Sequence, residues 1–193
     1  MHNTIARSEL ILGGQRSGKS RRAEMLARDW LAQSPSHEAV LIATGQPWDD
    51  EMRARIARHQ ADRAERVHGM RTLEEPLALP EALGRCSNPH TLVVVDCLTL
   101  WLTNWLMPAE QVVSLKNEQN MPPPQSPVDF IATLATGPVI LVGNEIGLGV
   151  IPMGRETRDF VDALGRLNQG VAARCARVTL MVAGLPLTLK EQP

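Results

Sequence analysis

The chain has 193 residues, a formal net charge of −1 at pH 7 and a hydrophobic fraction of 44%. This length suits one domain with its own core, and the balanced charge argues against bulk attraction to nucleic acid or to a membrane surface. Aromatic residues make up only 3% and tyrosine is absent, which argues against a protein that binds single strands by base stacking. Because no apolar run is as long as a membrane span and no signal peptide is evident, we expect a soluble, cytoplasmic protein.

The cysteines predict no zinc site. Cys86, Cys97 and Cys175 form no paired motif with the spacing of zinc ligands, and their neighbours are apolar. We therefore expect reduced and mostly buried thiols, which are typical of cytoplasmic proteins.

Short apolar runs alternate with longer helical patterns along the chain. The predicted strands cover 10–12, 39–43, 92–95, 139–142 and 178–182, with a short edge strand around 71–73 and a final one near 187–189. The predicted helices cover 18–33, 49–66, 76–85, 98–107, 127–135 and 155–174. Continuous apolar runs are typical of parallel strands buried on both faces. The sequence therefore predicts a single α/β domain over 1–193, with a mostly parallel sheet and helices on both faces. The proline-rich stretch 108–127 predicts an exposed, mobile loop.

The strongest motif is a phosphate-binding loop (P-loop) between the first predicted strand and the first predicted helix. It matches the pattern G-x-x-x-x-G-K-[ST] in full, with the residues Gly13, Gly14, Gln15, Arg16, Ser17, Gly18, Lys19 and Ser20. Glycines allow the backbone N–H groups to wrap phosphate oxygens at the start of the helix. Lys19 supplies a positive charge to the outer phosphates, and the Ser20 hydroxyl is placed to bind Mg²⁺. Arg21 and Arg22 follow, either contacting phosphate or facing solvent.

A carboxylate is expected near the magnesium ion of such a site. Asp96 ends the apolar run 92–95, and the carboxyl ends of parallel strands line the ligand crevice of an open α/β sheet. Asp96 is therefore the second candidate magnesium ligand beside Ser20. Its alternative role is to cap the helix predicted at 98–107.

A histidine lies between arginines on the second predicted helix. Helical spacing puts Arg55, His59 and Arg63 in one row, on a helix that Asp49 or Asp50 caps. The two arginines disfavour a protonated imidazole, and a neutral imidazole nitrogen is a competent nucleophile toward phosphorus. Taken alone, the pattern also fits a histidine with only a packing or surface role.

Together these motifs resemble one family, the bifunctional adenosylcobinamide kinases and adenosylcobinamide-phosphate guanylyltransferases of cobalamin biosynthesis. The matching residues are Leu12 to Arg21, Ala23-Glu24, Ala43-Thr44, Asp50-Glu51-Met52, Arg55-Ile56, His59, Arg63, Arg71-Thr72, Glu74, Asp96-Cys97-Leu98-Thr99, Asn104, Asn144 to Pro152, Arg158, Phe160, Asp162, Gly165, Asn168 and Gln169. The P-loop alone is unspecific. The block that ends at His59 and the block that begins at Asn144 make the resemblance specific.

The resemblance implies a P-loop NTPase-like (RecA-like) fold and two reactions that use Mg²⁺. ATP or GTP first phosphorylates the hydroxyl of the aminopropanol arm of adenosylcobinamide. GTP then guanylylates His59 with release of pyrophosphate, and adenosylcobinamide phosphate takes the GMP to give adenosylcobinamide-GDP. The family also implies a homotrimer with the histidine-bearing helix near a subunit interface.

The resemblance further implies which residues form the site. His59 and Lys19 are the catalytic candidates. Besides the P-loop and Asp96, the nucleotide-binding candidates are Ala43, Thr44, Gly45, Gln60, Asp62, Arg63 and Glu74. Glu74 is equally consistent with a surface acid, and the glycines of 147–149 either form a loop over the ligands or simple turns.

Two other functions stay open from the residues alone. One is a monofunctional P-loop kinase for another small alcohol, in which His59 is merely structural. The other is a nucleotide-gated binding protein that uses the P-loop as a switch.

Overall fold

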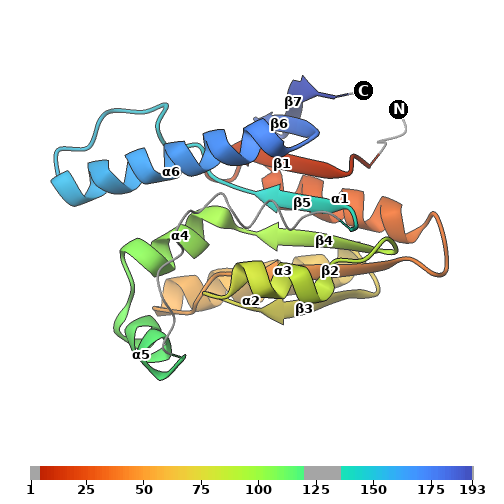
Figure 1. Ribbon diagram of the computed structural model, residues 1–193, viewed down its shortest axis with the longest axis horizontal. Coiled ribbons are helices and arrows are strands. Elements are labelled where there is room, and N and C mark those ends of the chain that lie inside the picture. The colour runs from red at the N-terminus through yellow and green to blue at the C-terminus, as the bar shows by residue number, and fades with distance from the viewer. Residues whose placement is uncertain (1–4, 120–135, 193) are drawn as a thin grey trace.

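The computed structural model describes residues 5–119 and 136–192, and the strands in these ranges form one seven-stranded sheet (Figure 1). In chain order the elements are β1 (Ser8–Gly13), α1 (Lys19–Leu31), β2 (Glu38–Ala43), α2 (Asp50–Arg66), β3 (Met70–Glu74), α3 (Leu79–Cys86), β4 (Thr91–Asp96), α4 (Leu98–Leu106), α5 (Glu110–Gln119), β5 (Val139–Val142), α6 (Arg155–Arg174), β6 (Arg177–Val182) and β7 (Leu185–Glu191). The strand order is β3-β2-β4-β5-β1-β6-β7, and only β6 and β7 pair antiparallel within the described chain. The predicted α/β class with a mostly parallel sheet is confirmed.

Helices cover both faces of the sheet, as the continuous apolar strands require. On one face, Leu26 and Ala27 of α1 pack against Ile11 and other strand residues. On the opposite face, α3, α4 and α6 enclose a second cluster in which Trp101 and Leu164 are fully buried. Each central strand thus contributes apolar side chains to two cores, which explains why apolar and polar residues do not alternate in its sequence.

The predicted loop over 108–127 is wrong for its first half, where the chain forms α5. Val112 of α5 is fully buried. The Lys116 ammonium donates to the Trp105 carbonyl of α4 at 3.1 Å and lies 4.6 Å from the centroid of the Trp105 ring. These tertiary contacts hold a helix whose own pattern is barely amphipathic. The remainder of the predicted loop, and the helix predicted at 127–135, lie outside the described residues.

The register of the sheet gathers candidate residues at its carboxyl edge. Ala43, the last residue of β2, pairs with Glu74 at the end of β3 and with Asp96 at the end of β4. Asp96 pairs in turn with Val142 of β5, the strand that lies between β4 and β1. The P-loop follows β1, so it lies at the same edge as these residues.

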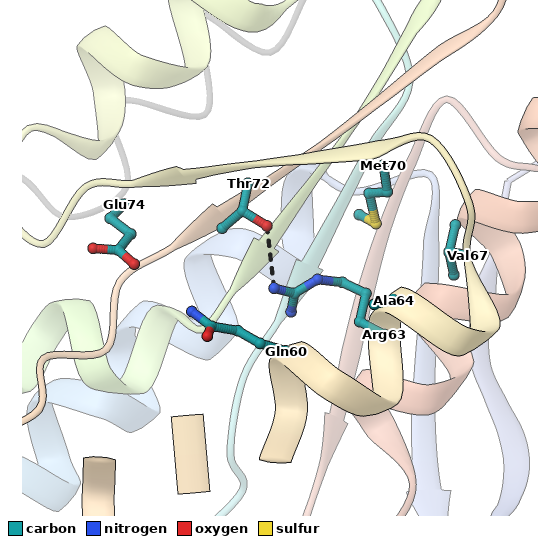
Figure 2. Close-up of a pocket in the computed structure, with 7 residues that line it drawn as sticks. All are labelled: Gln60, Arg63, Ala64, Val67, Met70, Thr72 and Glu74. Carbon is teal, nitrogen blue, oxygen red and sulfur yellow. Dashed lines mark hydrogen bonds between the residues drawn. The ribbon is translucent and has the colours of Figure 1, made fainter. Parts of the chain in front are cut away.

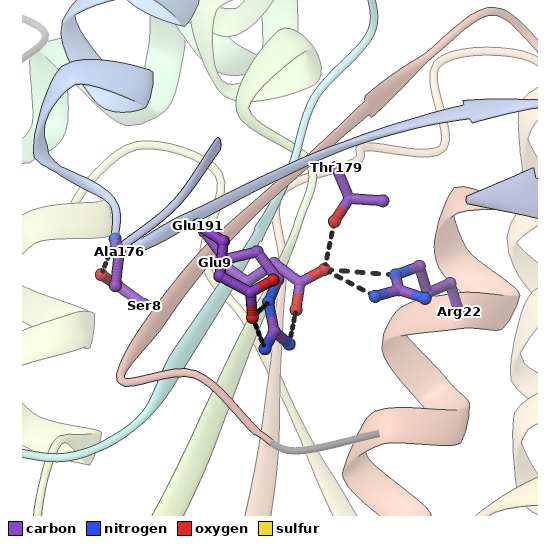
Figure 3. A network of polar contacts seen from close by, with 7 residues as sticks. Ser8, Glu9, Arg22, Ala176, Thr179 and Glu191 are labelled. Carbon is purple, nitrogen blue, oxygen red and sulfur yellow. Dashed lines mark hydrogen bonds and ion pairs between the residues drawn. The ribbon is translucent and has the colours of Figure 1, made fainter. Parts of the chain in front are cut away.

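A buried ionic cluster ties α1 to the β1–β6–β7 side of the sheet (Figure 3). The Glu9 carboxylate is only 1% exposed and accepts a 2.7 Å hydrogen bond from Thr179. It pairs with Arg22 of α1 at 3.0 Å and with Arg177 of β6 at 3.5 Å. Arg177 also pairs with Glu191 of β7 at 2.6 Å. Opposite charges and hydrogen bonds therefore compensate the burial of these groups.

The thiols agree with the sequence-based prediction. All three cysteines are free, and Cys97 and Cys175 are buried. Burial raises the pKa of Cys97 to about 12 and that of Cys175 to about 11, so both remain protonated at neutral pH. Within residues 5–119 and 136–192, no helix is long and apolar enough to cross a membrane.

We predict that Glu9→Gln destabilises the protein by about 3 kcal/mol, because it leaves two largely buried guanidinium groups without their shared carboxylate. Urea unfolding should show a lower midpoint with an unchanged slope. The control is Glu38→Gln, which breaks a pair between Glu38 and Arg71 whose side chains are 58% and 70% exposed. That change should cost less than about 1 kcal/mol. Equal effects of the two substitutions would contradict a stabilising role for the buried cluster.

Candidate functional site: a P-loop flanked by a histidine-bearing helix

The P-loop has the backbone geometry that its glycines predict. Gly13 has a φ of 152° and Gly18 has a φ of 100°. A Cβ on Gly13 would lie 2.5 Å from the carbonyl oxygen of Met181 and 2.6 Å from Ser17 Oγ, so no larger residue fits there. Gly18 is the N-cap of α1, and the loop therefore presents the positive end of that helix.

The Ser17 hydroxyl provides an independent sign of an oxygen-rich ligand. Its Oγ is buried and has no hydrogen-bond partner among the described residues. A buried hydroxyl without a partner is costly, and a phosphate oxygen in the loop would satisfy it.

Lys19 is held within the loop by two carbonyl groups. Its Nζ donates to Gly13 O at 3.0 Å and to Gly14 O at 2.6 Å, and the residue is only 8% exposed. Burial lowers the pKa of Lys19 from its ordinary value, Asp96 opposes this effect, and Arg55 of α2 lowers the pKa further. Charges on β4 and α2 therefore both influence the pKa of the P-loop lysine.

Asp96 and Ser20 offer the hard oxygen donors that Mg²⁺ prefers. Asp96 is half-buried, and its carboxylate accepts no hydrogen bond from the described part of the chain. The alternative capping role is wrong, because Cys97 is the N-cap of α4 and no side chain caps that helix. Ser20 is half-buried in the first turn of α1. Since Mg²⁺ bound to phosphates usually takes one or two protein ligands, this donor set fits the ion.

The segment Ala43-Thr44-Gly45 is fixed beside Asp96 by a network that the sequence did not predict. The Thr44 amide donates to Asp96 O at 3.2 Å, and Thr44 Oγ1 donates to Cys97 O at 2.7 Å. Asn104 is fully buried and donates to Thr44 O at 2.9 Å and to Pro76 O at 3.0 Å. The available signal was a lone asparagine in the mostly apolar helix α4. Its place in the structure is to position the end of β2.

The row of Arg55, His59 and Arg63 lies on α2, as predicted. The helix begins after Asp49, whose carboxylate accepts from the Met52 amide at 2.7 Å. His59 is half-buried and makes no hydrogen bond to a described residue. Arg63 donates to Thr72 Oγ1 of β3 at 3.1 Å. None of the α2 side chains is fully buried, so the histidine does not belong to a dry core.

A cavity of about 380 Å³ opens between α2 and β3 (Figure 2). It brings together three of the predicted nucleotide-binding residues, Gln60, Arg63 and Glu74, and is completed by Ala64, Val67, Met70 and Thr72. Figure 2 shows Val67 and Met70 at one end and Glu74 at the other, with the Arg63 guanidinium between them. A cavity with one apolar wall and a carboxylate suits a flat, polar ring.

Two other residues with predicted ligand contacts, Asp62 and Arg22, form ion pairs within the protein instead. Asp62 pairs with Arg66 at 3.0 Å and does not line the cavity. Arg66 also pairs with Glu24 at 2.9 Å, which links α2 to α1 and raises the pKa of Arg66. Arg22 points to Glu9, so it is not available for phosphate, and Arg21 is exposed.

Comparison with known proteins decides the family. The model of the family described as cobinamide kinase / cobinamide phosphate guanyltransferase matches residues 9–189. The chain belongs to this family. A bifunctional adenosylcobalamin biosynthesis protein of Pseudomonas aeruginosa is 47% identical over 186 residues, covering 96% of this chain and 98% of the relative. A protein of the same description from Escherichia coli is 37% identical over 190 residues, covering 94% of this chain and 98% of the relative.

The fold also occurs outside the cobinamide kinase / cobinamide phosphate guanyltransferase family. The flagellar accessory protein FlaH of Methanocaldococcus jannaschii superposes with a TM-score of 0.55 over 97% of this chain and 80% of that chain. The two sequences share only 9% identity, so this likeness concerns the fold alone.

We predict that Gly13→Ala weakens nucleotide binding by roughly tenfold or more, because the added Cβ displaces the loop or the β6 backbone that it meets. Titration with a fluorescent GTP analogue measures the loss. Gly84→Ala in α3 is the control, since a Cβ there meets nothing within 4 Å. It should leave affinity unchanged and raise stability slightly. Unchanged affinity of Gly13→Ala would contradict the close packing of the loop.

Proposed function

We propose that the chain is a bifunctional enzyme of cobalamin biosynthesis. It phosphorylates adenosylcobinamide with ATP or GTP and then transfers GMP from GTP to the product through a guanylyl-histidine intermediate. The observation that carries the proposal is a half-buried His59, without a hydrogen-bond partner among the described residues, on the helix that lines the cavity beside β3. An ordinary P-loop kinase needs no such histidine.

In the first reaction the acceptor hydroxyl attacks the γ-phosphorus. The P-loop amides, the N-terminus of α1 and Lys19 stabilise the negative charge of the triphosphate and of the leaving diphosphate. Ser20 and Asp96 are the proposed ligands of Mg²⁺, which would supply further charge neutralisation on the phosphate oxygens. The catalytic contribution of the protein is positioning and electrostatic stabilisation.

In the second reaction an imidazole nitrogen of His59 attacks the α-phosphorus of GTP, and pyrophosphate leaves. The phosphate of adenosylcobinamide phosphate then attacks the same phosphorus, and the N–P bond breaks. Arg55 and Arg63, one turn away on either side, stabilise the negative charge of the departing pyrophosphate. A covalent intermediate lets each displacement handle one bulky partner at a time.

The cavity between α2 and β3 is the proposed place for the guanine nucleotide in the second reaction. Gln60 and Arg63, which lie within about one helical turn of His59 on α2, line it together with Glu74 of β3. A carboxylate accepts the paired N–H donors of a guanine edge or the hydroxyls of a ribose, which supports a role for Glu74. Ala43, Thr44, Gly45 and Asp62 complete the proposed contacts.

The first test is covalent labelling of His59. We predict that incubation with α-labelled GTP followed by denaturation leaves an acid-labile, base-stable label on the wild-type protein and none on His59→Ala. The kinase reaction of His59→Ala should continue at most of its rate, because γ-transfer does not use the histidine. His68→Ala is the control, since His68 is exposed just after the same helix.

Lys19→Ala provides the comparison, because loss of the P-loop charge should impair both reactions. Absence of label on the wild-type protein, with kinase activity intact, would favour the monofunctional kinase. Slow nucleotide hydrolysis that no corrinoid accelerates would favour a nucleotide-gated binding protein.

We further propose that the enzyme is a cytoplasmic homotrimer. Support comes from large exposed apolar side chains in the connection between β5 and α6, where Val150 and Met153 are both 96% exposed. A monomer seldom leaves such a group uncovered. Sedimentation equilibrium should give three times the 21.2 kDa mass of the chain. A mass equal to that of one chain would refute the trimer.

A further inference from the structure

Glu145 is an acidic residue beside the P-loop to which the proposed mechanism gives no role. It follows β5, the strand between the P-loop strand β1 and the Asp96 strand β4. The Glu145 amide donates to Gly13 O at 3.1 Å, and the Lys19 ammonium donates to the same oxygen at 3.0 Å. The backbone of Glu145 is thus hydrogen-bonded directly to the first residue of the P-loop.

The half-buried Glu145 side chain is held through both of its carboxylate oxygens. One carboxylate oxygen accepts from Asn168 Nδ2 at 3.3 Å and the other from the Gly147 amide at 3.4 Å. Asn168 of α6 is only 4% exposed and also donates to Asn144 O at 3.1 Å. Glu145 borders a cavity of about 310 Å³ between α6 and β7, which Lys190 also lines.

The space around this asparagine is closely filled. A Cβ on Gly143 would lie 3.1 Å from Leu12 Cδ2 and 3.4 Å from Asn168 Oδ1. The Asn144 amide is fixed as well, because it donates to Thr99 Oγ1 at 2.8 Å. Contacts with α4, α6 and the P-loop therefore fix the end of β5 together. A group that takes part in a reaction needs such fixed positioning, whereas an ordinary connecting loop does not.

The two reactions differ in their need for a base. The hydroxyl that accepts the γ-phosphoryl group must lose its proton, whereas the phosphate that accepts GMP is already an anion. Asp96 ends the neighbouring strand β4 and is the proposed magnesium ligand, whereas Glu145 follows β5 directly beside the P-loop strand and has no other assigned role. This reasoning rests on the proposed function.

We propose that Glu145 is the general base of the kinase reaction and that Asn168 is its positioning residue. As the acceptor oxygen bonds to the γ-phosphorus, its O–H bond breaks and the proton passes to the Glu145 carboxylate. The bond between the γ-phosphorus and the bridging oxygen breaks at the same time, and its electron pair remains on the nucleoside diphosphate. The protonated carboxyl then returns its proton to water.

The decisive variant is Glu145→Gln, which retains an acceptor oxygen for one of the two contacts, with Asn168 or with Gly147, and cannot accept the proton. Its kinase turnover with adenosylcobinamide and ATP should fall by about a hundredfold or more, with little change in the KM for ATP. Its guanylyl transfer, measured separately with GTP and supplied adenosylcobinamide phosphate, should match that of the wild type. Glu156→Gln, an exposed acid in the first turn of α6, is the control and should change neither rate.

Asn168→Ala tests the positioning role. The kinase turnover should fall by about tenfold while guanylyl transfer and the KM for ATP stay unchanged, because the carboxylate is still present and merely less well held. A loss of structure would lower both reactions together. Equal losses in both reactions, or an undiminished kinase rate in Glu145→Gln, would overturn the assignment. A wild-type protein without either activity would refute the proposed function instead.

Discussion

The carbonyl oxygen of Gly13 accepts hydrogen bonds from the Lys19 ammonium and the Glu145 amide, so a single atom joins β1, the start of α1 and the end of β5. These parts must keep their relative positions if a phosphoryl group is to meet its acceptor. The arrangement depends on glycine, because a Cβ at this position would collide with the Met181 carbonyl of β6. Close packing against β6 thus fixes the position of the P-loop. The ionic cluster around Glu9 of β1 also holds α1 and β6 to β1.

The sheet order separates the proposed roles of the side chains around that atom. The strands β2 and β3, with α2, lie on one flank of β4 and supply Glu74 and His59. The end of β5 lies between Asp96 and the P-loop and supplies Glu145. The proposed nucleophile for the α-phosphorus and the proposed base for the γ-phosphoryl acceptor therefore come from opposite flanks of β4. One phosphate cradle can serve two reactions because each reaction uses a different neighbour.

The parts of the fold that were predictable from sequence are those that local pattern controls. A strand buried on both faces needs an apolar residue at nearly every position, which is why β4 and β5 were evident. The pair Asp49 and Asp50 marked the start of α2, and the structure shows that Asp49 is the cap. The P-loop was evident because its backbone conformation demands its residues. Helix α5 was missed because Val112 and Lys116 stabilise it through contacts with the rest of the molecule. The pairing of Glu9 with Arg177 joins residues 168 positions apart, and no local pattern reports such a contact.

The charges around the P-loop explain why the site requires a ligand. Lys19 is buried, its pKa is lowered by that burial, and Arg55 adds a second positive charge near it. Asp96 opposes these cations only in part, and the buried Ser17 hydroxyl has no acceptor or donor among the described residues. A bound triphosphate offsets both the repulsion between the cations and the cost of the unpartnered hydroxyl, since its oxygens pair with the cations and accept from the hydroxyl. Because the cations approach from α1 and α2, their mutual repulsion falls when the phosphate lies between them. The same ligand that carries the transferred group therefore stabilises the arrangement of the groups that act on it.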